Sequence, residues 1–397
     1  GNVKLTGSAS TSSMPGVSIN WARILSTTGT VTIDSGTNPT TFGASSTSSA
    51  VYLGADTAGG ATGNIDINAG SLTWAGTVNA RTTGDLTIDS GSSQSFASGV
   101  TIASNLSLAE VSNVRIGTAG TSAASQNTAN VTLAGALASA GNIRVYGGDI
   151  AANANVTGNG LDGQILLKAT GSISQAVSTA LRTNSGKIVL WSDADETNGG
   201  NVIVKGSICS APTATTCDAN ATSGGDDVVI GGGAASVSDT SVPGGYSTGA
   251  ATTDYNTTSG VVFGTLGSSG TGAKLYSAGG NVKISGRTYV TASAISSYAF
   301  GVIFMSSSEI HSGLGKIFIE GNNSTGSTSS GYRFPVEWNA WGGTSKFTST
   351  NSSSDSITVR AIETRTSSGI NANNAGGEFK NPNGGLLIQT DNFMANM

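Results

Sequence analysis

The sequence predicts an all-β protein, a parallel β-helix (β-solenoid) in which short strands stack coil upon coil and loop insertions leave the stack. Three observations support this prediction: a recurring phrase, a composition rich in glycine and poor in charge, and the absence of helical periodicity. The phrase is a glycine, a polar residue and an apolar–any–apolar triplet, and it begins at Gly1, Gly63, Gly84, Gly141, Gly186, Gly200, Gly280 and Gly315. A turn residue followed by a short strand, repeated along a chain, is typical of repeat architectures.

The composition separates this chain from both ordinary globular domains and disordered chains. Glycine supplies 58 of 397 residues, and charged residues supply only 10%, against about 25% in ordinary domains. Disordered chains lack β-branched residues and carry a high net charge, whereas here Val and Ile recur at regular spacing and the net charge is −5. Few windows keep apolar residues at helical spacing without a glycine or a Ser/Thr cluster, so strands are expected instead of helices.

The strands that the phrases supply are too short to be stable alone and must stack. Weaker triplets such as Val31-Thr32-Ile33 fill the longer gaps between phrases, which gives a coil of roughly 20–30 residues, a solenoid-like period. Alternation directs Ile65 and Ile67 inward and Asp66 towards water. A sandwich of hairpins would show similar alternation, but the Asn-Gly and Asp-Gly turns typical of hairpins are sparse, which favours parallel stacking.

The polar residues are assigned to the surface and the corners of the coils. Ser, Thr and Asn are expected on the outside, where they form ladders with the residue above. Gly and Asn are expected at the corners because they tolerate positive φ. The whole chain, 1–397, is interpreted as one β-helix with insertions at 205–225, 231–260 and 321–355; the alternative is two domains with a joint near 231–260.

The two cysteines, Cys209 and Cys217, enclose a short polar loop that contains Pro212. This spacing predicts a disulfide, which requires an oxidising compartment. The alternative is two unrelated buried thiols. A metal site is disfavoured, because no CxxC spacing occurs and the single histidine, His311, lies about 100 residues away.

Motifs for catalysis are weak, so we expect no enzyme activity, no cofactor and no metal. His311 is interpreted as a loop histidine without a catalytic partner, and no nucleophile elbow is present. Acidic clusters at 193–196 and 226–227 could serve a β-helix polysaccharide lyase or hydrolase, or bind calcium at 193–196, but they also read as solvated turns. The dinucleotide-type spacing at 158–163 leads into a strand instead of a helix and carries no weight.

An aromatic cluster is the best candidate for ligand binding. Tyr332, Phe334, Trp338 and Trp341 lie close together in the sequence. Exposed aromatic faces stack on sugars or anchor protein partners. The alternative, which we favour, is that they cover the hydrophobic strip of the β-helix. The acidic balance, with a pI of about 4.9 and no basic run, excludes an electrostatic footprint for nucleic acid, and no apolar stretch is long enough for a transmembrane helix.

Several segments resemble a known family. The passages Gly186–Asp195, Gly199–Val202, Ser277–Gly286 and Gly313–Gly321 resemble filamentous-haemagglutinin-like exoproteins. The resemblance implies a right-handed parallel β-helix, secretion by a bacterium and a role in surface fibres or adhesins, many of them exported by two-partner secretion. The family's Asn-Pro-Asn-Gly motif belongs to an N-terminal secretion domain; here Asn381-Pro382-Asn383-Gly384 lies near the C-terminus and is interpreted as a plain turn.

The expected function is therefore an extracellular structural or adhesive rod. A β-helix end exposes unpaired backbone groups, so head-to-tail self-association is expected. The first alternative is a module that binds a cell-surface glycan or matrix ligand through its insertions. The second is a polysaccharide lyase or hydrolase.

Overall fold

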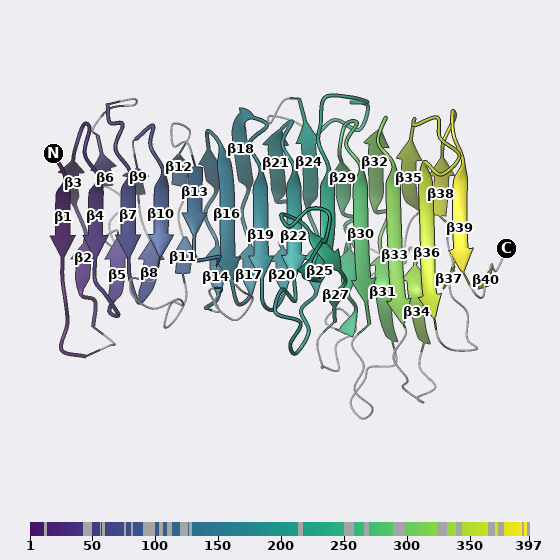
Figure 1. Ribbon diagram of the computed structural model, residues 1–397, viewed down its shortest axis with the longest axis horizontal. Helices are drawn as coiled ribbons and strands as arrows, with labels where there is room; N and C mark the ends of the chain where they lie inside the picture. The colour runs from purple at the N-terminus through teal and green to yellow at the C-terminus, as the bar shows by residue number, and fades with distance from the viewer. Residues whose placement is uncertain are drawn as a thin grey trace. The chain divides into compact units, whose positions relative to one another are not determined.

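The strands of this chain pair in parallel with the equivalent strands of the neighbouring coils, so that β1 (Val3–Thr6) pairs with β4 (Val31–Asp34) and β4 with β7 (Ile65–Asn68) (Figure 1). The computed structural model describes residues 1–11, 14–42, 50–55, 57, 60–74, 77–80, 82–89, 100–102, 106–108, 113–119, 126, 129–212, 217–249, 258–265, 270–288, 298–323, 332–338, 344–363, 370–371, 377–390 and 393–394. Within these ranges no helix has the length and apolar character needed to cross a membrane.

The chain divides into two compact units, Gly1–Lys168 and Ala169–Met397. Each unit is a parallel β-helix, and the predicted fold class is confirmed. The division lies near residue 168, outside the 231–260 segment in which the two-domain alternative placed it. One strand, β19 (Ile165–Ala169), covers the point of division.

Three faces make up the first unit. The first face contains β1 (Val3–Thr6), β4 (Val31–Asp34), β7 (Ile65–Asn68), β10 (Leu86–Asp89), β13 (Asn113–Ile116) and β16 (Asn142–Gly147). The second contains β2 (Val17–Ile19), β5 (Pro39–Phe42), β8 (Ser71–Trp74), β11 (Val100–Ile102), β14 (Val131–Leu133) and β17 (Ile150–Ala152). The third is formed by β3 (Ala22–Leu25), β6 (Ala50–Gly54) and β9 (Thr77–Ala80), and by β12 (Leu106–Leu108), β15 (Leu137–Ser139) and β18 (Val156–Leu161).

The second unit repeats this plan. Its first face, called the long sheet below, contains β22 (Ile188–Ser192), β25 (Val228–Ala235), β30 (Val282–Arg287), β33 (Ile317–Asn323), β36 (Ile357–Glu363) and β39 (Leu386–Thr390). The second face contains β20 (Ile173–Gln175), β23 (Val202–Val204), β28 (Val261–Phe263), β31 (Tyr298–Phe304), β34 (Tyr332–Glu337), β37 (Ile370–Asn371) and β40 (Phe393–Met394). The third contains β21 (Ala180–Asn184), β24 (Ser207–Ala211), β29 (Lys274–Tyr276), β32 (Glu309–Gly313), β35 (Ser345–Ser349) and β38 (Gly377–Lys380). Two short strands, β26 (Pro243–Gly245) and β27 (Ser247–Thr248), pair with β25 and β30.

The coils differ in length between the two units. In the first unit, register partners lie between 19 residues apart (Val131 and Ile150) and 34 residues apart (Val31 and Ile65), close to the predicted period. In the second unit they reach 67 residues, between Ser207 and Lys274. Much of the extra length lies in the segments 205–225 and 231–260, which the sequence predicted as insertions, and it does not disturb the register.

Alternation fills the core as predicted. Ile65 and Ile67 are fully buried, whereas Asp66 between them is partly exposed. In register, Ile65 pairs with Leu86 and Ile67 with Ile88, so like side chains stack on like. Burying one such aliphatic side chain stabilises the fold by roughly 1.5–3 kcal/mol.

The ranges predicted as insertions contain strands of the coil. Residues 205–225 include β24, which pairs with β21 and β29, and 321–355 include β34 and β35. Within 231–260, the part up to residue 249 returns to the long sheet as β26 and β27. The loops that leave the sheets are therefore shorter than the sequence pattern suggested.

The phrase glycines are required by the close approach of coils, and the expected reason, positive φ, is wrong for them. None of the phrase glycines belongs to the positive-φ residues of the described chain. A Cβ on Gly63 would lie 2.0 Å from the carbonyl oxygen of Gly29, and one on Gly315 would lie 1.9 Å from that of Gly280. Glycine corners therefore stack directly on one another, and no side chain fits between them.

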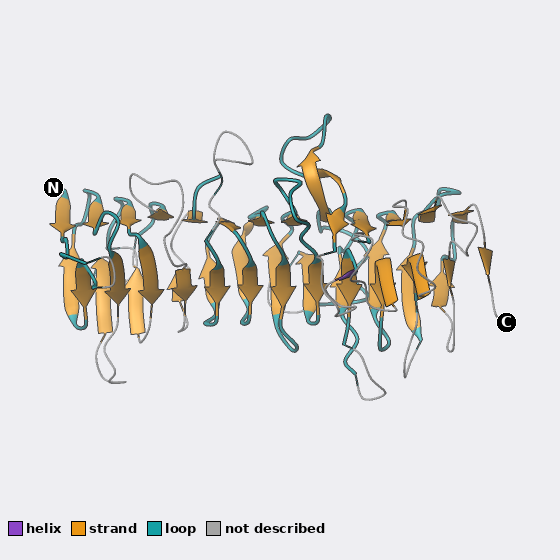
Figure 2. Cartoon of the chain, turned by 90° about the horizontal axis from the view of Figure 1, so that it is seen from below, coloured by secondary structure: helices purple, strands orange, loops and turns teal. Residues whose placement is uncertain are grey.

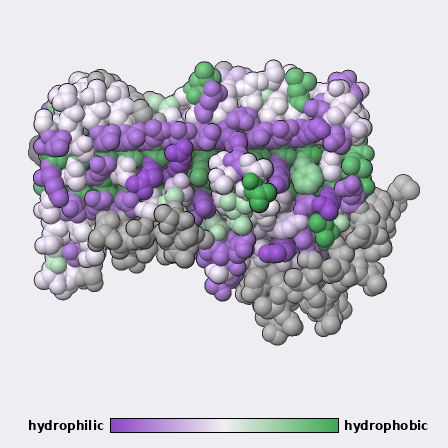
Figure 3. Space-filling model, in the orientation of Figure 1, coloured by the Kyte–Doolittle hydropathy of each residue, from purple (hydrophilic) through white to green (hydrophobic). Residues whose placement is uncertain are grey.

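The polar residue after each glycine forms a ladder that links coils. The Oδ1 atom of Asn64 accepts a hydrogen bond of 3.1 Å from the backbone N–H of Asp85 in the next coil, and Asn142 Oδ1 accepts one of 3.0 Å from Gln164. In the second unit, Asn281 Oδ1 accepts from Lys316 N at 3.0 Å. Figure 3 shows polar side chains in a purple row along the edge of the sheet in each unit. The polar residue of the phrase therefore caps a backbone N–H group of the next coil, in addition to forming part of a turn.

Serine and threonine are also found inside the coils, contrary to the expectation that they lie outside. Ser139, Ser277 and Ser312 are fully buried. Their hydroxyl groups donate to the carbonyl oxygen of the phrase glycine two or three residues later, for example from Ser312 to Gly315 at 2.7 Å. A buried hydroxyl group is tolerated because it satisfies a corner carbonyl that would otherwise lack a donor.

Candidate functional site

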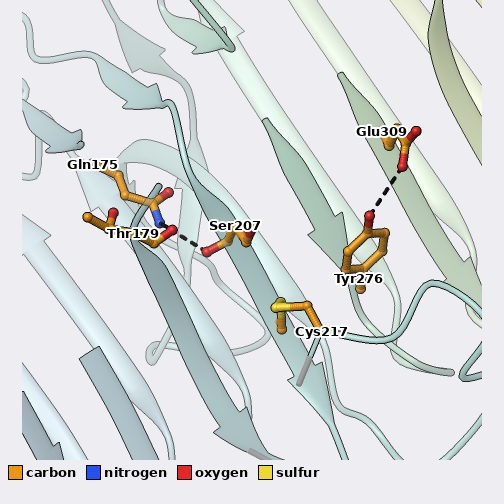
Figure 4. Close-up of a disulfide and its surroundings, with 7 residues drawn as sticks. Gln175, Thr179, Ser207, Cys217, Tyr276 and Glu309 are labelled. Atoms are coloured by element: carbon orange, nitrogen blue, oxygen red, sulfur yellow. Dashed lines mark hydrogen bonds between the residues drawn. A yellow bond between two sulfur atoms is a disulfide. The ribbon is translucent and has the colours of Figure 1, made fainter. Parts of the chain in front are cut away.

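The predicted disulfide is present. Cys209 and Cys217 are bonded with their Cα atoms 5.6 Å apart, within the usual range for this bond. Cys209 lies on β24 and is 1% exposed. Figure 4 shows the bond beside β24, with Tyr276 and Glu309 on the neighbouring strands. The disulfide joins β24 to Cys217, eight positions later in the chain.

Two residues of the aromatic cluster, Phe334 and Trp338, are buried, so the ligand-binding interpretation loses two of its four residues. Phe334 is 6% exposed and stacks on Phe300, with ring centroids 6.4 Å apart. Trp338 is 4% exposed and meets Phe379 edge-on at 5.3 Å. Tyr332 begins strand β34, and Trp341 lies outside the described residues.

Buried rings cannot stack on a sugar. Phe334 belongs to a hydrophobic cluster on the second face that also includes Val262, Phe300, Ile303 and Met305. The alternative interpretation, that the aromatic residues cover the hydrophobic strip, accounts for Phe334 and Trp338.

His311 lies in strand β32, not in a loop. Its ring faces Tyr276, with centroids 5.2 Å apart, and its Nε2 atom is 3.6 Å from Glu309 Oε2. The Tyr276 hydroxyl group donates to the same carboxylate at 3.2 Å. Burial lowers the pKa of His311 and outweighs the opposing effect of Glu309. The arrangement is a polar cross-strand cluster of Tyr276, Glu309 and His311.

The most elaborate surface of the second unit is an arm, residues 231–249, that lies on the outside of the long sheet. Figure 2 shows a two-stranded hairpin, formed by the end of β25 and by β26, that rises from the sheet. The tip is tethered by Asp239, whose carboxylate is 3.3 Å from Lys187 Nζ. The arm then returns as β27, where Thr248 pairs with Gly200 in an antiparallel bridge.

The arm explains why outward-facing side chains of this sheet are apolar and buried. Val189, Trp191 and Val229 occupy outward positions, yet they are 4%, 3% and 7% exposed. The indole Nε1 of Trp191 donates to the carbonyl oxygen of Gly233 at 2.8 Å. An apolar outward position where other coils carry polar residues was the sequence signal for a covering segment, and sequence reasoning missed it.

Asp193 lies directly after β22, under this arm. It has a φ of 48° and is only 2% exposed. Its backbone oxygen accepts from Gly233 N at 3.1 Å, and the neighbouring Glu196 Oε1 accepts from Ala234 N at 2.7 Å. Burial raises the pKa of Asp193 from 3.8 to about 6, although a hydrogen bond from Thr248 and the charge of Arg287 both lower it.

A second polar group lies further along the long sheet. Glu320 accepts from the hydroxyl group of Tyr246 and is 2.9 Å from Arg360 Nη1. Arg287 lies over the Tyr246 ring at 5.9 Å and donates to Thr248 Oγ1 at 3.1 Å. Burial, followed by the contact with Glu320, raises the pKa of Tyr246 to about 12. These contacts fasten the base of the arm to β30, β33 and β36.

Asp193 and Glu320 are too far apart to form a glycosidase pair. Asp193 follows β22, and Glu320 lies on β33, three strand spacings away in the same sheet. At about 4.8 Å each, the spacings separate them by about 14 Å, beyond the ~5–10 Å that a carboxylate pair requires. Asp227 is engaged in the corner ladder, where it accepts from Asn281 N at 2.7 Å. No group of three or more metal-ligating side chains occurs among the described residues.

Comparison of the chain with models of known families, with curated proteins and with solved structures found no match.

Proposed function

We propose that the chain is a structural segment of an extracellular surface fibre or adhesin stalk, as the resemblance to filamentous-haemagglutinin-like exoproteins implies. The observation that supports this most is the repeated corner. In coil after coil, a stacked glycine, a capping Asn or Asp and a buried hydroxyl group hold neighbouring coils together while the outward positions vary. Such a corner extends a scaffold by repetition, and it needs no bound group.

The disulfide supports an extracellular location. Disulfides persist in oxidising compartments and are rare in the cytosol. Surface labelling of the producing cells with an impermeant reagent, followed by fractionation, tests this point. Recovery of the protein only from the cytosol would contradict it.

The same proposal includes head-to-tail association. In the described residues, β1 pairs only with β4, and β39 pairs only with β36, so these residues supply no partner for the outer side of either strand. The inward-facing residues at these edges are exposed: Leu5 is 38% exposed and Leu386 is 43% exposed. Edge strands of this kind pair with another chain unless a charge or a covering element prevents it.

Electron microscopy and sedimentation velocity test this association. Filaments, and sedimentation that rises with protein concentration, are the expected results. Leu5→Lys should abolish the association because it places an inward-pointing charge on the edge strand. Leu161→Lys, at a position that is 75% exposed and away from both edges, is the matched control and should associate like the native chain. Monomers of the native chain at every concentration would refute this part of the proposal.

A glycan-binding or matrix-binding module is the second candidate, and a polysaccharide lyase or hydrolase the third. The arm is the feature that favours a binding role, because Val237 at its tip is fully exposed. Binding of the purified chain to a glycan array and turnover of polyuronic substrates separate these candidates from the structural role. Turnover would overturn the structural proposal.

A further inference from the structure

The arm, residues 231–249, rests on a carboxyl group that its own docking removes from water. Asp193 is 2% exposed, and among the described residues its Oδ1 atom has no hydrogen-bond partner. The arm residues Gly233 and Thr248 lie against it, the first through a 3.1 Å hydrogen bond to the Asp193 backbone oxygen. If the arm lifted, this carboxyl group would regain its hydration.

A bound cation is not the explanation for the empty Oδ1. Arg287 acts on Asp193 as a nearby positive charge and is itself held in place by Thr248 and Tyr246. A metal ion at Oδ1 would be repelled by this guanidinium group. Two other carboxylates of the same loop already accept hydrogen bonds, Glu196 from the N–H of Ala234 and Asp195 from Thr197.

The charged groups that face Asp193 come from two elements. Asp195 and Glu196 on its own loop raise the cost of ionising it, and Arg287 on β30 lowers that cost. The charged side chain of the arm itself, Asp239, is paired with Lys187 at the tip. Desolvation is the largest of the effects on Asp193.

We propose that residues 231–249 form a pH-sensitive strap, which is held most tightly on the long sheet when Asp193 is protonated and is loosened when Asp193 ionises. Loosening exposes the outward-facing apolar residues Val189, Trp191 and Val229. The strap thereby controls access to an apolar stripe on the long sheet.

The direction of the pH effect follows from the two states of the strap. With the strap released, Asp193 is hydrated and titrates near its ordinary pKa of 3.8; with the strap docked, its pKa is about 6. Docking is therefore strongest below pH 3.8 and weakens as the pH rises towards 6. Each pKa unit is a tenfold change, so the docking equilibrium falls by ~100-fold across this window.

Hydrogen exchange of the full-length protein measures this equilibrium. The N–H groups of Gly233, Ala234 and Thr248 all donate across the contact between the strap and the 193–200 loop. Their protection factors, corrected for intrinsic exchange, should fall by up to ~100-fold between pH 4 and pH 7.5. The amides of β24 serve as the internal reference and should change much less.

Two variants separate Asp193 from its neighbours. Asp193→Asn keeps the shape and the left-handed backbone conformation that Asn also tolerates, and it should make strap protection independent of pH. Glu196→Gln is the matched control: it removes a carboxylate from the same loop, keeps an acceptor for Ala234 and should retain the pH dependence.

Each outcome bears on the proposal. Strap protection in the native protein that is independent of pH refutes it, whether or not the variants fold. An unchanged pH dependence in Asp193→Asn also refutes it, as does loss of the dependence in Glu196→Gln with retention in Asp193→Asn.

Discussion

Replacement of Gly63 by alanine tests whether glycine corners are set by contact between coils. The new Cβ would lie 2.0 Å from the carbonyl oxygen of Gly29, whereas ordinary contacts begin near 3.4 Å. The two coils would have to separate by more than 1 Å at this corner. That movement would stretch the neighbouring backbone hydrogen bond from Val31 N to Asn64 O, which is 2.9 Å long.

The expected cost follows from these two effects. Overpacking against the backbone costs about 1–3 kcal/mol, and a weakened hydrogen bond adds about 1 kcal/mol. We therefore expect Gly63→Ala to destabilise the first unit by about 3 kcal/mol. For a unit of this size, Gly1–Lys168, this corresponds to a Tm lower by about 6–12 °C.

The assay is thermal unfolding of the full chain followed by far-UV circular dichroism, with Gly158→Ala as the matched control. At Gly158, which lies in the same unit, the nearest atom to a new Cβ is 3.3 Å away. The smaller conformational freedom of alanine in the unfolded chain offsets that mild contact. If Gly63→Ala unfolds at the same temperature as Gly158→Ala, the contact argument is wrong.

Three further predictions concern the ladder, the disulfide and the aromatic cluster. Asn142→Ala leaves the Gln164 N–H without its side-chain acceptor and should lower the free energy of unfolding by about 1 kcal/mol; Asn142→Asp, which keeps an acceptor, should lose less in the same denaturant titration. Reduction of the Cys209–Cys217 bond should destabilise the protein by about 2.5 kcal/mol, the loop-closure value for so short a loop. A melting temperature that is the same with and without reductant would contradict this. Trp338→Ala removes a side chain that is 4% exposed and should cost about 3–5 kcal/mol; an unaltered melting temperature together with lost glycan binding would restore the ligand-binding interpretation.

The sequence was sufficient for the fold because the decisive signal is local. In Ile65-Asp66-Ile67, alternation over three residues already determines which side chains enter the core, and the same triplet returns in each phrase. Parallel stacking followed from the scarcity of hairpin turns. The disulfide was also predictable, since Cys209 and Cys217 lie within one short loop.

The physical reasons for the glycine and serine positions were harder to predict, because they are contacts between residues that the fold brings together. The carbonyl oxygen that excludes a side chain at Gly63 belongs to Gly29, and the hydroxyl group that satisfies Gly315 comes from Ser312. Single-residue preferences therefore gave the wrong cause for glycine and the wrong side for serine. Only the register shows which residues are neighbours.

The candidate site was the least predictable part. Asp193 was noticed as part of an acidic turn, but its burial depends on an arm that begins about 40 residues later in the chain. The aromatic cluster attracted interest because of its composition, and burial of Phe334 and Trp338 removed the basis for that interest. Burial by a segment that is distant in the sequence does not produce a periodic pattern of residues.

Stacking by neighbour contacts has a mechanical consequence. A coil pulled from the end of a unit breaks one interface at a time, because it touches only the coils beside it. Tension is therefore relieved in steps, and each step frees a length of chain fixed by the coil. The shortest coil of the first unit spans 19 residues and would release ~65 Å, whereas the longest coil of the second unit spans 67 residues and would release ~220 Å. Breaking one interface between coils therefore lengthens the second unit more than the first.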